Sequence, residues 1–143
     1  MCLVLYLGSE KRRPLIAWDE SAPRFHVKDD DADAKKASAH FRKAHVYYVG
    51  SDNGCGCGFR QEHDSMIDDA EQLVAKTDNQ TLLHAYIKRC LADEDSVELY
   101  SCWSGDEALP MESDRTIGVD ELIDDDFWFA ERQRTIVVQR TET

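Results

Sequence analysis

The alternation of apolar and polar positions divides the chain into strand-like and helix-like segments. Short apolar or alternating runs are typical of strands, whereas apolar positions that recur every three or four residues are typical of helices. The pattern predicts strands at 3–7, 24–28, 45–49, 97–103, 127–129 and 135–139. The last two are predicted to pair as an antiparallel hairpin.

Two helices are predicted between the third and fourth strands. Helical spacing relates Met66, Ile67, Ala70, Leu73 and Val74 in the first, and Leu82, Leu83, Tyr86, Ile87, Cys90 and Leu91 in the second. We expect the helices to be split at Thr77-Asp78-Asn79, which supplies turn and capping residues. A further helical turn is predicted at 119–123. This order of elements predicts an α+β fold, a single mixed β-sheet with two main helices packed on one face.

Composition narrows the class of protein. The 143 residues suit a single globular domain over 1–143, with 42% apolar and 32% charged residues. The net charge of −12 disfavours binding to nucleic acid or to anionic membranes. No apolar segment is long enough to span a bilayer, and no signal peptide is recognisable, so we expect a cytoplasmic protein. Its five cysteines are therefore expected to be reduced thiols.

The most distinctive stretch is the strand 45–49 with the glycine- and cysteine-rich segment that follows it. The strand runs through the polar turn 50–53 into Gly54-Cys55-Gly56-Cys57-Gly58-Phe59. Asn53-Gly54 is a strong hairpin signal, which favours a β-hairpin with Cys55 on the returning strand. Glycine also permits a tight loop, so a glycine-rich loop leading to a helix fits equally well.

This segment, 50–59, is the predicted binding site. The glycines at 54, 56 and 58 leave the backbone bare, so that a ligand can approach it closely. We therefore expect binding by Gly54, Cys55, Gly56, Cys57 and Gly58. If strands 45–49 and 97–103 are parallel neighbours, the segment leaves the carboxyl end of a strand, where open α/β sheets usually bind ligands.

The two neighbouring thiols admit three roles. Cys55 and Cys57 could hold a metal such as zinc, completed by His63 and by Cys2 or Cys102 from neighbouring strands, because zinc takes four nitrogen or sulfur ligands. They could instead exchange thiol and disulfide, although the ring closed by Cys-Gly-Cys would be strained. The third role is structural, as compact side chains in a tightly packed backbone.

Two resemblances bear on this choice. Met1-Cys2 followed by an apolar strand resembles the opening of N-terminal nucleophile hydrolases, which implies Cys2 as a nucleophile with its own α-amino group as base. The opening Met1–Leu3, Trp18-Asp19-Glu20 and the segment Gly54–Phe59 together resemble a family of small uncharacterised bacterial proteins. That family carries no known activity, so the resemblance supports the choice of segment alone.

The sequence thus predicts a small binding or interaction module with its site at 50–59, which could hold a metal and whose partner is a small ligand or a protein. The alternative is a cysteine-dependent enzyme, acting by thiol redox through Cys55 and Cys57 or through Cys2 as nucleophile. Trp103 and Trp128 are candidates for a homodimer surface.

Overall fold

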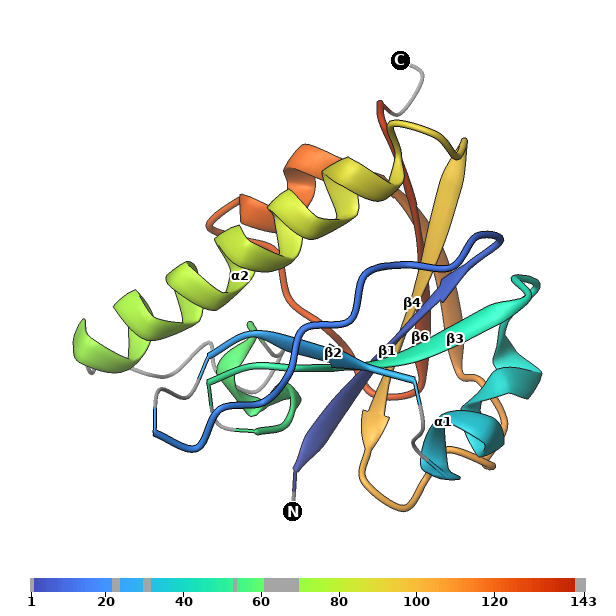
Figure 1. Ribbon diagram of the computed structural model, residues 1–143, viewed down its shortest axis with the longest axis horizontal. Coiled ribbons are helices and arrows are strands. Elements are labelled where there is room, and N and C mark those ends of the chain that lie inside the picture. The colour runs from blue at the N-terminus through green and yellow to red at the C-terminus, as the bar shows by residue number, and fades with distance from the viewer. Residues whose placement is uncertain (1, 22–23, 30–31, 53, 61–69, 141–143) are drawn as a thin grey trace.

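The structure, a computed structural model, describes residues 2–21, 24–29, 32–52, 54–60 and 70–140. These residues form one six-stranded sheet in the order β2-β3-β1-β4-β6-β5 (Figure 1). The strands are β1 Leu3–Ser9, β2 His26–Lys28, β3 His45–Gly50, β4 Ser96–Trp103, β5 Ser113–Gly118 and β6 Gln133–Val138. The helices are α1 Ala32–Ala37 and α2 Ala70–Cys90, with shorter 3-10 turns η1 Ser38–His40, η2 Gly56–Gly58 and η4 Val119–Ile123.

β1 lies near the middle of the sheet and is antiparallel to both of its neighbours. Leu5 pairs with Val49 of β3 on one side and with Ser101 of β4 on the other. β3 and β4 therefore point the same way with β1 between them, so they are not the neighbours that the sequence suggested. The glycine- and cysteine-rich segment nevertheless leaves the carboxyl end of β3, beside the start of β1.

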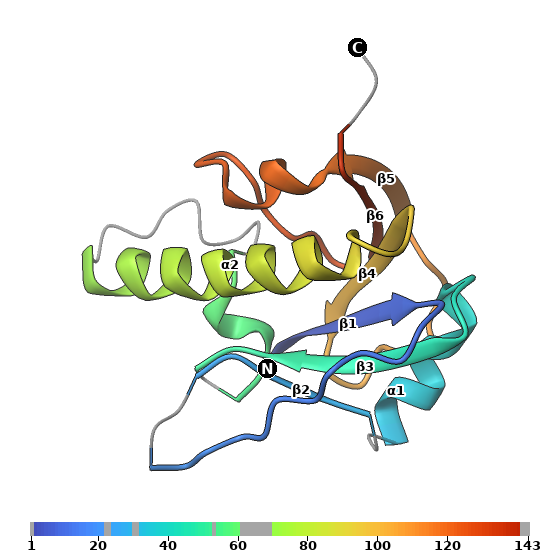
Figure 2. The ribbon, with the colours of Figure 1, turned by 45° about the horizontal axis from the view of Figure 1, so that its top comes forward.

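Both faces of β1 are covered, which explains its unbroken apolar run. On one face, Leu5 and Leu7 lie in a core that also contains Leu83 and Ile87 of α2. On the other face, Tyr6 lies in a second core with residues of α1, β3 and β4. α2 covers the first face and α1 the second, so the two helices lie on opposite sides of the sheet (Figure 2). Complete burial of a leucine or isoleucine side chain contributes about 1.5–3 kcal/mol.

The expected α+β class, with a single mixed sheet and two helices, is confirmed. The strands predicted at 3–7, 45–49 and 97–103 correspond to β1, β3 and β4, and β2 occupies the sheet edge as expected for 24–28. The helical turn at 119–123 is also confirmed, as η4. Among the described helices, none has the length and apolar character that crossing a membrane requires.

The predicted break at 77–79 is wrong, because α2 runs without interruption through it. The polar side chains there bond back along the helix instead of capping an end. Thr77 Oγ1 donates to the Leu73 carbonyl at 2.9 Å, and Asn79 Nδ2 donates to the Ala75 carbonyl at 2.9 Å. Residues 61–69, which include much of the first predicted helix, lie outside the described part of the chain. Val74, predicted to be apolar-facing, is 60% exposed.

The predicted hairpin of 127–129 with 135–139 is also wrong. Phe127 and Phe129 are buried in the core, and the Phe129 amide donates to the Arg60 carbonyl at 2.8 Å instead of pairing with β6. β6 instead pairs with β4 antiparallel and with β5 parallel. β5 escaped prediction because its first positions, such as Ser113 and Asp114, are polar and exposed.

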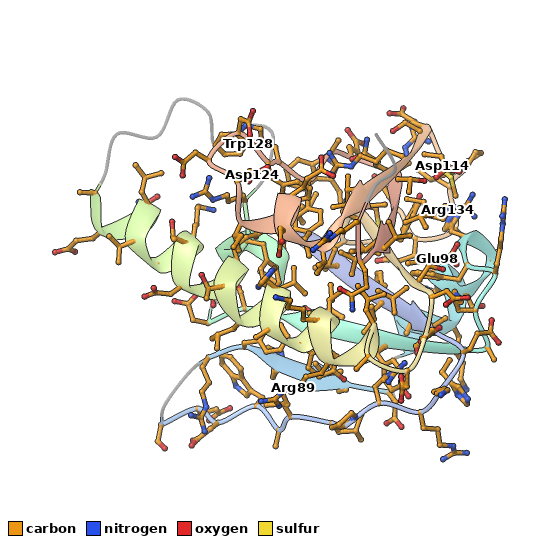
Figure 3. The ribbon with its side chains drawn as sticks, turned by 90° about the horizontal axis from the view of Figure 1, so that it is seen from above. Arg89, Glu98, Asp114, Asp124, Trp128 and Arg134 are labelled. Atoms are coloured by element: carbon orange, nitrogen blue, oxygen red, sulfur yellow. The ribbon has the colours of Figure 1, made fainter. Side chains whose placement is uncertain are left out.

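A row of charges crosses three strands at the β5 side of the sheet. The Arg134 guanidinium on β6 lies 2.5 Å from the Asp114 carboxylate on β5 and 3.9 Å from the Glu98 carboxylate on β4 (Figure 3). Glu98 is almost completely buried, and it also accepts a hydrogen bond from the Arg42 amide at 2.8 Å. These contacts tie the edge strand β5 to the sheet interior.

Candidate metal centre

The segment that follows β3 folds as a compact loop. The chain turns at Gly54, which has a φ of +82°, and residues Gly56–Gly58 form the 3-10 turn η2. Cys55 is the residue that caps this turn. The β-hairpin alternative is therefore wrong, and the glycine-rich loop is the structure adopted. We call residues 51–59 the cysteine loop.

Ser51 closes the cysteine loop from its first position. Its amide and its hydroxyl both donate to the Cys55 carbonyl, at 2.8 and 2.6 Å. The same hydroxyl oxygen accepts a hydrogen bond from the Gly58 amide at 3.0 Å. Because Ser51 is completely buried, these bonds form away from water and hold the two ends of η2 together.

Two glycines let the cysteine loop pack closely, Gly56 against the backbone of β1 and Gly58 against a side chain of the loop itself. A Cβ placed on Gly56 would lie 2.8 Å from the Leu3 carbonyl oxygen, at the beginning of β1. A Cβ on Gly58 would collide with the Ser51 side chain. The loop therefore seats against the first residues of β1, as the green turn beside the blue strand shows (Figure 2).

α2 supports the loop through side chains that sequence reasoning missed. Lys76 Nζ donates to the carbonyls of Cys57 and Phe59, at 2.6 and 3.2 Å. Asn79 Nδ2 donates to the Gly58 carbonyl at 3.1 Å. The side chains of Lys76 and Asn79 are both buried. Lys76 extends the three-to-four-residue spacing of the buried stripe that includes Asn79, and a search for buried polar positions on that stripe could have found both.

The loop brings three sulfurs together. The Sγ atoms of Cys2, Cys55 and Cys57 all lie within 4.8 Å of one another. Cys2 stands immediately before β1, and its carbonyl accepts a hydrogen bond from the Ser104 amide at 2.8 Å. Its side chain is exposed, whereas the two loop cysteines are half-buried. We call these three residues the cysteine cluster.

Cys55, one of the two half-buried members of the cluster, holds its proton in the metal-free protein. Burial raises the pKa of the Cys55 thiol from 9.0 to about 12, and hydrogen bonds to the other two cluster thiols add to the rise. The Cys57 amide donates to Cys55 Sγ at 3.4 Å, which works in the opposite direction by favouring the thiolate. At neutral pH the Cys55 sulfur is therefore a thiol.

The remaining predicted ligands have different positions. His63 lies outside the described residues. Cys102 is fully buried in the core on the α1 side of the sheet, and Cys90, the last residue of α2, is buried in the other core, so neither belongs to the cluster. All five cysteines are free in the structure. Of the two ligands considered from neighbouring strands, Cys2 is the one that meets the loop.

Comparison with known proteins gave no match: no family model matches the chain, and neither does a curated protein or a solved structure. The resemblance to a family of small bacterial proteins therefore stays a prediction.

Proposed function

We propose that the protein is a small metal-binding module that holds a zinc-like ion through the thiolates of Cys2, Cys55 and Cys57. One observation carries the proposal. Two segments far apart in the sequence, the residue before β1 and the loop after β3, place three sulfurs within 4.8 Å of one another. Thiolate ligands select soft or borderline metals such as zinc and copper(I) over calcium and magnesium.

The spacing of the sulfurs supports this assignment. Zinc–sulfur bonds of about 2.3 Å in a tetrahedron place the sulfurs about 3.8 Å apart. The observed separations, at most 4.8 Å, require each sulfur to move inward by less than about 1 Å. Rotation of the exposed Cys2 side chain supplies most of that movement, while the hydrogen bonds of Ser51 and Lys76 hold the loop in place.

Three protein ligands leave one position of a tetrahedral site open. A water, a small ligand or the sequence-predicted His63 would occupy it. An open position accords with a binding module whose partner is a small molecule or a protein group that coordinates the metal. Since the Cys55 thiol must lose its proton to bind, metal binding releases protons and strengthens as the pH rises.

Zinc titration of the reduced protein tests the proposal. Stoichiometric binding is expected, measured by competition with a chromophoric chelator and by native mass spectrometry. Serine at Cys2, Cys55 or Cys57 should each weaken binding by more than the roughly 10–100-fold loss that changes in outer-shell partners cause. Cys102→Ala is the matched control, because this thiol lies outside the cluster. Absence of stoichiometric zinc, or equal binding by the cluster variants, contradicts the proposal.

A second titration locates the fourth ligand. His63→Ala should weaken zinc binding if this histidine completes the site, whereas His84→Ala should not, because the His84 ring bonds to the Asp120 carboxylate at 2.8 Å and is not part of the cysteine cluster. Equal affinities for both variants would assign the fourth position to water or to an exogenous ligand.

A cysteine-dependent enzyme is the second candidate. The exposed side chain of Cys2 favours it, because a nucleophile must be reached by its substrate. The raised pKa of Cys55 works against it, since the thiolate is the reactive form. Alkylation of the metal-free protein at neutral pH discriminates the two: rapid, selective modification of Cys2 favours the enzyme, and uniform slow modification of the cluster does not.

A further inference from the structure

We propose that oxidation controls the metal centre, by joining Cys2 to a cysteine of the cysteine loop in a disulfide that releases the ion. This inference rests on the proposed function and names the regulation of the same site. The observation behind it is that the thiols of Cys2, Cys55 and Cys57, from two separate segments of the chain, lie within 4.8 Å of one another and that Cys2 is exposed.

Cys2 is the thiol that an oxidant reaches first. It is the exposed member of the cluster, while Cys55 and Cys57, within the cysteine loop, are half-buried. A sulfur separation of at most 4.8 Å must close to about 2.05 Å for a disulfide. Cys2 precedes the first strand, so rotation about its own side-chain bonds can bring its sulfur inward without moving β1.

A bridge within the loop is disfavoured by the way the loop is held. Joining Cys55 to Cys57 closes a strained Cys-Gly-Cys ring. The turn between them is fixed by the bonds of Ser51 to the Cys55 carbonyl and of Lys76 to the Cys57 carbonyl. A bridge from Cys2 leaves these bonds in place, because it adds a link between segments that already touch at Gly56 and Leu3.

The chemistry balances with a peroxide as oxidant. The Cys2 thiolate attacks the O–O bond of hydrogen peroxide, forming a sulfenic acid and releasing hydroxide, which takes up a proton to become water. A loop thiolate then attacks the Cys2 sulfur, the S–S bond forms, and the second oxygen leaves as hydroxide, which also takes up a proton to become water. In sum, two thiolates, one peroxide and two protons from the solvent give one disulfide and two waters. The zinc ion departs because two of its three protein ligands are no longer thiolates. Its charge stays unchanged, since only the sulfurs are oxidised.

The test uses the full chain loaded with zinc and then freed of excess metal. Hydrogen peroxide is added in stoichiometric amount, and released zinc is followed with the chromophoric chelator. The protein is then alkylated and digested with trypsin. Cleavage after Lys11, Lys43 and Arg60 places Cys2 in one peptide and both loop cysteines in another. A bridge to Cys2 therefore gives a cross-linked pair of peptides, and a bridge within the loop gives one peptide lighter by two hydrogens.

The expected result is release of zinc in step with the cross-linked pair, one ion for each disulfide, and recovery of binding after reduction with a thiol. Cys2→Ser should give no cross-link, whereas Cys102→Ala should behave as the unaltered chain. A disulfide within the loop, a bridge between two molecules, or zinc retained after oxidation overturns the inference. In each of these cases the reduced protein still binds zinc, so the proposed function survives; failure of the reduced protein to bind zinc removes both.

Discussion

Alanine at Gly56 tests whether close packing of the cysteine loop on β1 is what assembles the centre. The added Cβ would lie 2.8 Å from the Leu3 carbonyl oxygen, where ordinary contact begins at 3.4 Å, so the loop must retreat by about 0.6 Å (3.4 minus 2.8 Å). The steric cost is about 1–3 kcal/mol. Alanine also reduces the freedom of the unfolded chain, which offsets about 0.4–1 kcal/mol. The net expectation is a loss of about 1–2 kcal/mol.

Urea unfolding of the metal-free protein measures this loss. With an m value of about 2 kcal/mol/M, the midpoint should fall by about 0.5–1 M. Because the retreat carries both loop sulfurs away from Cys2, zinc affinity should fall by about tenfold or more. Gly105→Ala, in the turn after β4, is the matched control. The φ of +100° at this position makes alanine cost about 1–2 kcal/mol, but no atom lies within 4 Å of the added Cβ. This variant should lose stability and keep its zinc affinity.

Two results would refute the reasoning. Unchanged stability of Gly56→Ala would mean that the contact with Leu3 is not tight in solution. Reduced stability with unchanged zinc affinity would mean that the distance between the loop and Cys2 does not govern binding.

Three further changes probe the loop and the sheet. Ser51→Ala should cost about 1–3 kcal/mol, because it leaves a buried loop amide without its acceptor, whereas the exposed Ser38→Ala should cost far less; urea midpoints compare them. The raised pKa of Cys55 contributes stability that is present below pH 9 and lost as the pH rises toward about 12. The free energy of unfolding of the metal-free protein should therefore fall over that range more than that of Cys55→Ser. Urea unfolding at a series of pH values checks this, and the same pH dependence in both proteins would contradict it. Arg13→Met should cost about 1.5–3 kcal/mol, because it removes a guanidinium hydrogen bond from the nearly buried Glu94 carboxylate and leaves Lys43 paired with it, while the exposed neighbour Arg12→Met should be close to neutral in thermal unfolding.

The sequence was most informative where one physical factor decides the structure. The apolar run from Leu3 to Leu7 is buried on both faces, and no alternative placement would satisfy it. The cysteine loop was likewise locatable, because its glycines have few uses other than turns and close backbone contacts. Cys2 was among the ligands considered from neighbouring strands, since an apolar strand directly after it had to enter the sheet.

Other elements depended on contacts that sequence patterns do not show. Asn79 looked like a turn residue, and it instead lies inside α2, where its side chain bonds to the helix and to the cysteine loop. Phe127 and Phe129 looked like a strand, but aromatic residues fill a core equally well from an irregular segment. β5 looked like a loop because its exposed edge needs few apolar residues, and its pairing is supplied by β6.

The position of β6 has a consequence for how the chain is made. β6 lies between β4 and β5, although it follows both of them in the chain, and β5 pairs with no other described strand. Until residues 133–138 have left the ribosome, β4 therefore presents an open edge and β5 has no strand to pair with. Sheets that close by such distant pairings fold slowly, and their nascent forms are prone to aggregate. For this protein, the vulnerable period of synthesis lasts until residues 133–138 have emerged and paired with β4 and β5.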